Sequence, residues 1–128
     1  ILPLICYEAI YSGKIFNNSN FDLIINISED GWFGNSIGPQ QHFIHSIFRA
    51  VESGKYLIRS ANNGVTAIIN PLGMIDQQIE FGQSGYVDFS QKKEIQPTVF
   101  SKYGNKIFMM LILLYIFLIF SFNRFNNE

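Results

Sequence analysis

The stretch FDLIINIS, residues 21–28, decides the fold. It is apolar at most positions, has the length of a strand, and runs into the loop EDGWFGNSIGPQ, residues 29–40, which holds three glycines and one proline. A strand that is apolar on both sides of its pleat is typical of an α/β sheet covered on both faces. Glycine and proline in the next segment indicate a surface loop. We therefore predict a buried strand that ends in an exposed loop.

The segments around this strand predict a helix and further strands. A helix is expected from Pro39, since proline is tolerated in a first helical turn, to Gly54, which favours a helix end. Its apolar residues recur on one helical face; they are Phe43, Ile44, Ile47, Phe48 and Val51. Strands are expected over 2–6, 56–61 and 65–70, and a hairpin over 74–81 and 85–90. The pattern is that of one α/β domain.

The C-terminal part of the chain is of a different kind. The run IFMMLILLYIFLIFSF, residues 107–122, holds sixteen residues without a charge. As a helix it would rise about 24 Å, somewhat less than the roughly 30 Å of a bilayer's hydrocarbon core. Lys106 and Arg124 flank the run and could snorkel to the two interfaces. We predict a transmembrane helix over 107–123, with a buried core helix as the alternative.

The chain accordingly divides into four predicted parts. Residues 1–100 form a partial α/β domain, residues 101–106 a juxtamembrane linker, residues 107–123 the transmembrane helix and residues 124–128 a short tail. A chain of 128 residues has room for one domain and not two. Its formal net charge of −1 gives no reason to expect a nucleic-acid partner. His42 and His45 are three residues apart, but without further ligands no metal site is expected.

Cys6 is the single cysteine of the chain and stands where the first predicted strand ends. A lone cysteine is often a small buried apolar residue. Strand ends are also where α/β proteins present reactive groups. Glu8 would share a strand face with Cys6, but a carboxylate disfavours a thiolate, so a cation has to come from elsewhere. The residues alone leave a buried thiol and a nucleophile as alternatives.

Three segments carry a family resemblance: PLICYEAI (3–10), NISEDGWFGNSIGPQQH (26–42) and RAVESGKYLIRSANNGVTAIINPLG (49–73). In this order they resemble the nitrilase-type domain of the bacterial apolipoprotein N-acyltransferase family, within the carbon-nitrogen hydrolase superfamily. The W-F-G motif joined to S-I-G-P-x-Q-H, with R-x-x-N-N-G-V-T-A, distinguishes this family from soluble nitrilases. The resemblance implies an α/β fold, the C-terminal part of a nitrilase-type α-β-β-α sandwich followed by one transmembrane helix.

The resemblance also implies an acyl transfer in two steps. The family's cysteine takes an acyl chain from a membrane phospholipid as a thioester and passes it to the amino group of a diacylglyceryl-modified lipoprotein. Cys6 matches this nucleophile, and Glu8 matches a second acidic residue of the catalytic site. Tyr7, between them, and Trp32, in a loop near the entrance, match residues that would contact substrate. No cofactor is expected.

The implied location is the bacterial inner membrane, with the α/β domain on the periplasmic side. The family's catalytic glutamate and lysine precede the cysteine, whereas only five residues, none with an ionisable side chain, precede Cys6. We therefore expect a C-terminal fragment that is inactive by itself. A non-catalytic membrane-tethered remnant and a nitrilase-type amidase domain are the alternatives. Glu29 departs from the family, in which we expect an amide at this position.

Overall fold

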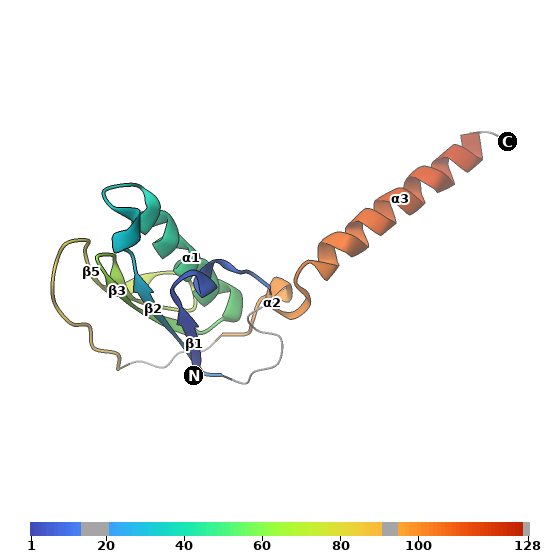
Figure 1. The fold of residues 1–128 in the computed structure, drawn as a ribbon. Coiled ribbons are helices and arrows are strands. Elements are labelled where there is room, and N and C mark those ends of the chain that lie inside the picture. The colour runs from blue at the N-terminus through green and yellow to red at the C-terminus, as the bar shows by residue number, and fades with distance from the viewer. Residues whose placement is uncertain (14–20, 91–94, 127–128) are drawn as a thin grey trace.

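An α/β body carries a long C-terminal helix that projects away from it (Figure 1). The structure is a computed structural model and describes residues 1–13, 21–90 and 95–126. The elements, in chain order, are β1 (Leu2–Ile5), the 3-10 turn η1 (Cys6–Ile10), β2 (Leu23–Glu29), the 3-10 turn η2 (Gly31–Phe33), α1 (Gly38–Ser53), β3 (Tyr56–Asn62), β4 (Thr66–Ile69), β5 (Ile75–Ile79), α2 (Val99–Tyr103) and α3 (Lys106–Asn126).

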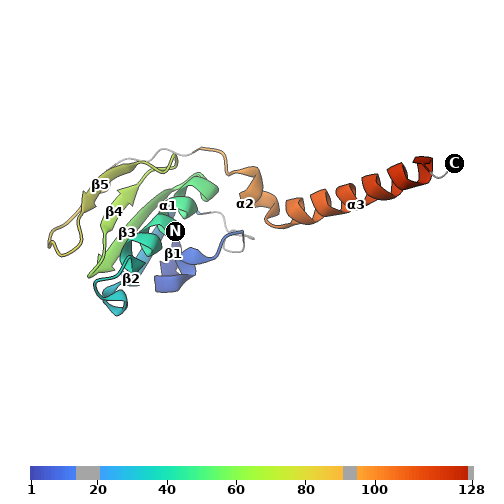
Figure 2. The ribbon, with the colours of Figure 1, turned by 90° about the horizontal axis from the view of Figure 1, so that it is seen from above.

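The five strands form one mixed sheet in the order β1-β2-β3-β4-β5 (Figure 2). β1, β2 and β3 are parallel, whereas β4 and β5 are antiparallel to their neighbours. Parallel neighbours need a crossover, and α1 supplies it between β2 and β3. The register pairs Ile5 with Ile27 and Glu29 with Asn62, so the three parallel strands end at one edge of the sheet. The predicted mixed α/β fold is confirmed.

Helix α1 packs on one face of this sheet, and the core lies between them. The buried apolar cluster consists of Leu4, Ala9, Ile24, Phe43, Ala50, Leu57, Val65, Ala67 and Ile69. The opposite face is less covered by the described residues: Ile27 is 60% exposed and Ile5 is 67% exposed. The expectation of a sheet covered on both faces is therefore not met within the described residues, where α1 covers one face.

The ends of α1 follow from two residues that the sequence marks. Pro39 lies in the first turn, where its missing N–H group would have no partner in the helix. Gly54 ends the helix in the left-handed conformation, with φ of 68°, and donates its N–H to the carbonyl of Ala50 at 3.0 Å. A side chain at this position would also collide with the carbonyl oxygen of Ile95, only 2.5 Å from an ideal Cβ. The predicted helix boundaries are confirmed.

The predicted hairpin over 74–81 and 85–90 is wrong. Residues 75–79 form β5, but β5 pairs with β4, and residues 85–90 form no strand. The side chain of Gln77 takes both backbone groups of Asp88, donating to its carbonyl at 3.0 Å and accepting from its N–H at 3.2 Å. Because a side chain occupies these groups, the later segment follows β5 without a backbone ladder.

The C-terminal helices are tied to the body through α2. The Thr98 hydroxyl accepts the Ser101 N–H at 3.2 Å as the cap of α2, and both the N–H and the hydroxyl of Thr98 donate to the Glu52 carbonyl. The predicted linker, 101–106, thus contains the end of α2 and the start of α3. Within the described residues, no helix combines the length and apolarity needed to cross a membrane. In the predicted tail, residues 127–128 lie outside the described residues.

Candidate active site

Cys6 lies at the sharp turn where β1 ends and η1 begins, at the edge of the sheet where the parallel strands end. Its φ of 48° is in the left-handed region, which costs a residue other than glycine roughly 1–2 kcal/mol. Such strain at a strand-to-helix turn is how nucleophiles are presented above an α/β sheet. The thiol is half-buried, and its Sγ lies 3.9 Å from the Ser28 hydroxyl. The position suits a reactive group.

Glu8 takes a different place from the one expected on the strand. Because β1 ends at Ile5, Cys6 and Glu8 belong to a 3-10 turn, and they do not share a face as they would in a strand. The exposed Glu8 carboxylate turns back and accepts the Ile5 N–H at 2.6 Å. Glu8 therefore closes the turn that carries Cys6. Its hydrogen bond is the half of a capping box in which the third residue of the turn accepts the backbone N–H of the N-cap residue, here Ile5.

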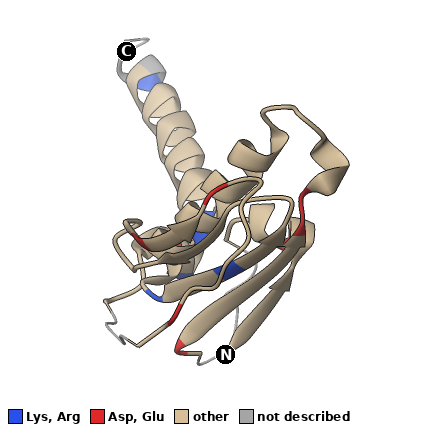
Figure 3. Cartoon of the chain, turned by 90° about the vertical axis from the view of Figure 1, so that its left-hand side faces the viewer, with Lys and Arg blue, Asp and Glu red and all other residues tan. Residues whose placement is uncertain are grey.

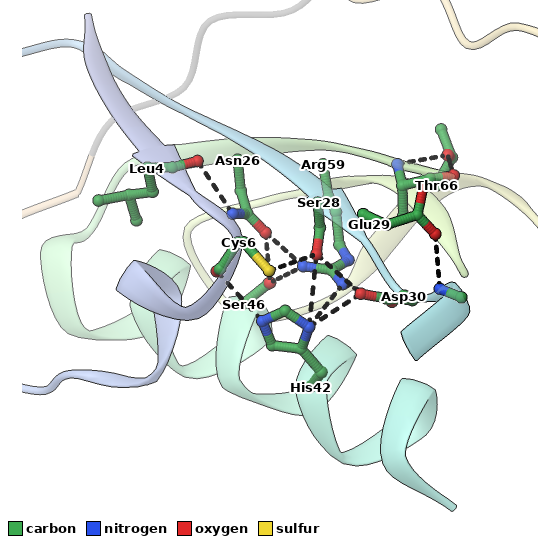
Figure 4. A network of polar contacts seen from close by, with 12 residues as sticks. Leu4, Cys6, Asn26, Ser28, Glu29, Asp30, His42, Ser46, Arg59 and Thr66 are labelled. Carbon is green, nitrogen blue, oxygen red and sulfur yellow. Dashed lines mark hydrogen bonds and ion pairs between the residues drawn. The ribbon is translucent and has the colours of Figure 1, made fainter. Parts of the chain in front are cut away.

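A buried network of polar side chains lies beneath this turn (Figure 4). Asp30 is fully buried and accepts from the Ser28 hydroxyl at 2.7 Å and from Arg59 Nη2 at 2.7 Å. His42 Nδ1 lies 2.9 Å from the same carboxylate, and His42 Nε2 lies 3.1 Å from the Cys6 carbonyl oxygen. The network thus joins the end of β2 to the middle of β3 and to α1, and it reaches the backbone of Cys6.

A second branch of the network fixes Arg59 from its other side. Arg59 Nη1 donates to the Asn26 side-chain oxygen and, at 3.1 Å, to the Ser46 hydroxyl. The Asn26 amide in turn donates to the Leu4 carbonyl at 3.1 Å. The fully buried side chains of Asn26, Ser46 and Arg59 therefore link β1, β2, β3 and α1 to one another.

The protonation state of Asp30 follows from its surroundings. Burial raises the pKa of Asp30, but the Ser28 hydrogen bond, the charge and hydrogen bond of Arg59 and the His42 hydrogen bond together bring it below its ordinary value. Asp30 is therefore ionised at neutral pH. Gly64 makes room for it, because an ideal Cβ at Gly64 would lie 2.2 Å from Asp30 Oδ2.

Tyr7 and Trp32, which are expected to contact substrate, differ in their surroundings: Tyr7 packs on the site and Trp32 does not. The Tyr7 ring stacks on the His42 ring, with centroids 5.2 Å apart, and lies 6.0 Å from Phe33. Trp32, on η2, is 87% exposed. The structure therefore brings Tyr7 to the Cys6 turn and leaves the Trp32 ring in solvent.

Glu29 stands at the rim of the same edge. Its exposed carboxylate accepts the Asn62 side-chain amide and, at 2.7 Å, the Gly31 N–H. These two hydrogen bonds, in this order, are the main causes that lower the pKa of Glu29. Glu29 is an anion that fixes the start of the W-F-G loop to the end of β3.

The sequence predicted that Cys6 stands at the end of a strand, as the structure shows, but it did not predict the buried Asp30 and Arg59. Arg59 carried a signal, since a charge inside the apolar strand YLIRSA needs a buried partner. Arg49 and Glu52, three residues apart on α1, form a second buried ion pair at 2.7 Å, and Glu52 also accepts the Gly13 N–H at 2.7 Å. Across the described ranges, no three His, Cys, Asp or Glu side chains gather as metal ligands.

Known proteins match most of the chain. Residues 1–89 match the family model of the carbon-nitrogen hydrolases. Apolipoprotein N-acyltransferase of Rickettsia bellii is 47% identical over 121 residues, which are 93% of this chain and 24% of that protein. The protein of the same name from Rickettsia prowazekii is 45% identical, over 93% of this chain and 24% of that protein. The one from Bradyrhizobium diazoefficiens is 41% identical, over 91% of this chain and 22% of that protein. The resemblance predicted from the sequence is confirmed, and the chain spans about a quarter of the length of these relatives.

Proposed function

Because the chain belongs to the carbon-nitrogen hydrolase family, we propose that it is part of an apolipoprotein N-acyltransferase whose nucleophile is Cys6. The observation that carries the proposal is the left-handed turn of Cys6, with φ of 48°, at the edge where the parallel strands end. A strained backbone costs free energy, and residues that keep such strain cluster at active sites, which in α/β proteins lie where the parallel strands end. The identity of the relatives supports the acyl chain as the group transferred.

The proposed reaction has two steps. The Cys6 thiol gives its proton to a general base and attacks the ester carbonyl of a phospholipid; an S–C bond forms, the ester C–O bond breaks, and the base returns the proton to the oxygen of the departing lysophospholipid. The α-amino group of a diacylglyceryl-modified lipoprotein then attacks the thioester. An amide N–C bond forms, the S–C bond breaks, and the amino proton returns to the thiol. No cofactor is required.

Residues 1–128 are proposed to need a longer protein for this reaction. The resemblance assigns a glutamate base and a lysine to segments ahead of the cysteine, and the part of the relatives beyond the match is about three quarters of their length. The apolar sheet face with Ile5 (67% exposed) and Ile27 (60% exposed) supports packing against a further layer, as in an α-β-β-α sandwich. By itself, the chain is proposed to be inactive.

Glu8, Tyr7 and Trp32 have proposed roles that follow from their positions. Glu8 holds the Cys6 turn through the Ile5 N–H, and its side chain is exposed to solvent. Tyr7, stacked at the same turn, and the exposed indole of Trp32 offer amphipathic rings to a lipid substrate. The proposed acyl donor is a membrane phospholipid, and the proposed acceptor is a lipoprotein.

Helix α3 is proposed to anchor the protein in the bacterial inner membrane, with the α/β body on the periplasmic side. It carries charge only towards its ends (Figure 3), and its apolar side chains face outward, among them Phe117, 65% exposed, and Phe120, 71% exposed. The uncharged run of sixteen residues rises about 24 Å, so Lys106 and Arg124 would snorkel to reach the interfaces of a roughly 30 Å core.

The anchor predicts how the protein behaves on extraction. The chain is expected to stay in the membrane pellet after washing in alkaline carbonate. A variant with Leu114→Lys and Leu118→Lys is expected in the supernatant, because each lysine at the centre of a helix adds about 2.5–3.5 kcal/mol to insertion. Release of the unchanged chain by carbonate would argue against the anchor.

A chimera tests the proposed function. Residues 1–128 replace the matched segment of the Rickettsia bellii relative, and the purified protein receives phospholipid vesicles and a diacylglyceryl peptide. Formation of N-acylated peptide is expected. Hydrolysis of small amides without acyl transfer would indicate an amidase instead, which the family match also allows. If the chimera folds but catalyses neither reaction, the segment is non-catalytic.

A further inference from the structure

We propose that His42 is a positioning residue that holds the turn of Cys6 in its left-handed conformation through the Cys6 carbonyl. The inference rests on the proposed role of Cys6 as the nucleophile. His42 Nε2 lies 3.1 Å from the Cys6 carbonyl oxygen, and His42 Nδ1 lies 2.9 Å from Asp30 Oδ1. One buried imidazole thus connects the backbone of the nucleophile to the most buried carboxylate of the site.

The chemistry of the contact with Cys6 fixes the direction of its hydrogen bond. A carbonyl oxygen can only accept, so His42 Nε2 carries a proton and donates it to Cys6. Asp30 cannot move to follow another partner, since Ser28 and Arg59 each hold it at 2.7 Å. The ring itself is 3% exposed and is covered by Tyr7, whose centroid lies 5.2 Å away. The donor is therefore pre-aligned.

The turn needs such a constraint. A left-handed residue other than glycine relaxes unless its surroundings hold it. The backbone is held before and after Cys6, since Glu8 accepts the N–H of Ile5, the preceding residue, at 2.6 Å and His42 donates to the carbonyl of Cys6 itself. Of these two side chains, Glu8 is exposed and follows Cys6 closely in the chain, whereas His42 comes from α1 and is anchored in the core.

The same geometry separates this role from that of a general base. His42 Nε2 lies 3.1 Å from the Cys6 carbonyl oxygen, whereas the polar side chain that contacts Cys6 Sγ within the described part of the chain is that of Ser28, at 3.9 Å. His42 therefore acts on the sulfur through the backbone. If the hydrogen bond from His42 to the Cys6 carbonyl were lost, the Cys6 thiol would be misplaced, but no group that accepts its proton would be removed.

Two substitutions separate the bonds of the imidazole. The amide nitrogen of asparagine takes the place of Nδ1, so His42→Asn keeps the contact with Asp30 and loses the one with Cys6. The amide nitrogen of glutamine takes the place of Nε2, so His42→Gln keeps the contact with Cys6. His45→Asn is the matched control, because His45 lies one turn further along α1 and packs on Phe48 instead.

The readout is the carbonyl carbon of Cys6 in the full chain. Cys6 is the single cysteine, so labelling cysteine with ¹³C at the carbonyl gives one NMR signal. His42→Asn is expected to move this signal upfield, as for a carbonyl that loses a hydrogen bond, while His42→Gln and His45→Asn leave it near its original position. A signal unchanged in His42→Asn, or moved equally in the Asn and Gln variants, would overturn the proposal.

The chimera then links the bond to catalysis. His42→Asn is expected to lower kcat for acyl transfer about 10- to 100-fold, the usual effect of a slightly misplaced reacting group, with KM little changed. His42→Gln is expected to restore most of the rate. Equal rates for His42→Asn and the unchanged chimera would contradict the positioning role. If the chimera transfers no acyl chain while the carbonyl signal behaves as expected, the proposed function fails and the hydrogen bond stands.

Discussion

Replacing Asp30 by alanine is expected to lower the free energy of unfolding by about 3–5 kcal/mol, the usual cost of leaving a buried charge without its partner. Arg59, fully buried, would lose the carboxylate that its Nη2 binds at 2.7 Å, and His42 would lose the contact of its Nδ1 with Asp30 at 2.9 Å. The measurement is urea denaturation of the full chain in detergent. Glu80→Ala, which removes an exposed carboxylate, is the control and is expected to change stability by about 0.5 kcal/mol or less.

The pH dependence of unfolding gives a second readout of Asp30. Its pKa in the folded chain is below the ordinary value of about 3.9, because the hydrogen bonds and the charge of Arg59 outweigh burial. The stabilisation is therefore fully present above about pH 4 and is lost as the pH falls through the folded pKa. Asp30→Asn should flatten this acid limb. An Asp30→Ala variant as stable as the Glu80→Ala control would mean that Arg59 finds another partner.

Replacing Cys6 by alanine in the chimera is expected to abolish acyl transfer, with a loss of at least about a thousandfold, since removal of a nucleophile commonly costs several orders of magnitude. Stability should change little, because the side chain is half-buried and its Sγ has only a long contact with Ser28 at 3.9 Å. Thermal unfolding by circular dichroism supplies this control. A transfer rate that survives in a folded Cys6→Ala variant would show that another residue is the nucleophile.

Local patterns in the sequence were enough to predict most elements. The apolar run at 21–28 became β2, and Pro39 and Gly54 mark the ends of α1, because strand length, helix periodicity and end signals are properties of neighbouring residues. The position of Cys6 at a strand end could be predicted for the same reason, since it follows directly from the end of β1.

The buried network could not be predicted, because its members are far apart in the chain. Asp30, His42 and Arg59 come from the end of β2, from α1 and from β3, and only the folded sheet brings them together. The inward face of β2 also carries Asn26 and Ser28, which a count of apolar residues treats as exceptions, whereas the apolar Ile27 lies on the more exposed face.

Two local expectations failed through details of backbone pairing. Cys6 and Glu8 do not lie on one face as they would in a strand, because β1 ends one residue before the cysteine and a 3-10 turn follows. The hairpin over 74–81 and 85–90 was lost because the side chain of Gln77, and not a neighbouring backbone, pairs with Asp88. Alternation of apolar residues indicates a strand but does not name its partner.

The acylation state of Cys6 tests the central claim most directly. The chimera is incubated with phospholipid vesicles in the absence of the lipoprotein acceptor, so that the second step cannot discharge the thioester. Mass spectrometry of the peptide that contains Cys6 is predicted to find the mass of one fatty acyl chain, removed by hydroxylamine and absent in Cys6→Ala. An unmodified Cys6 peptide in a chimera that still acylates the acceptor, or an acyl chain on any other residue, would contradict the account.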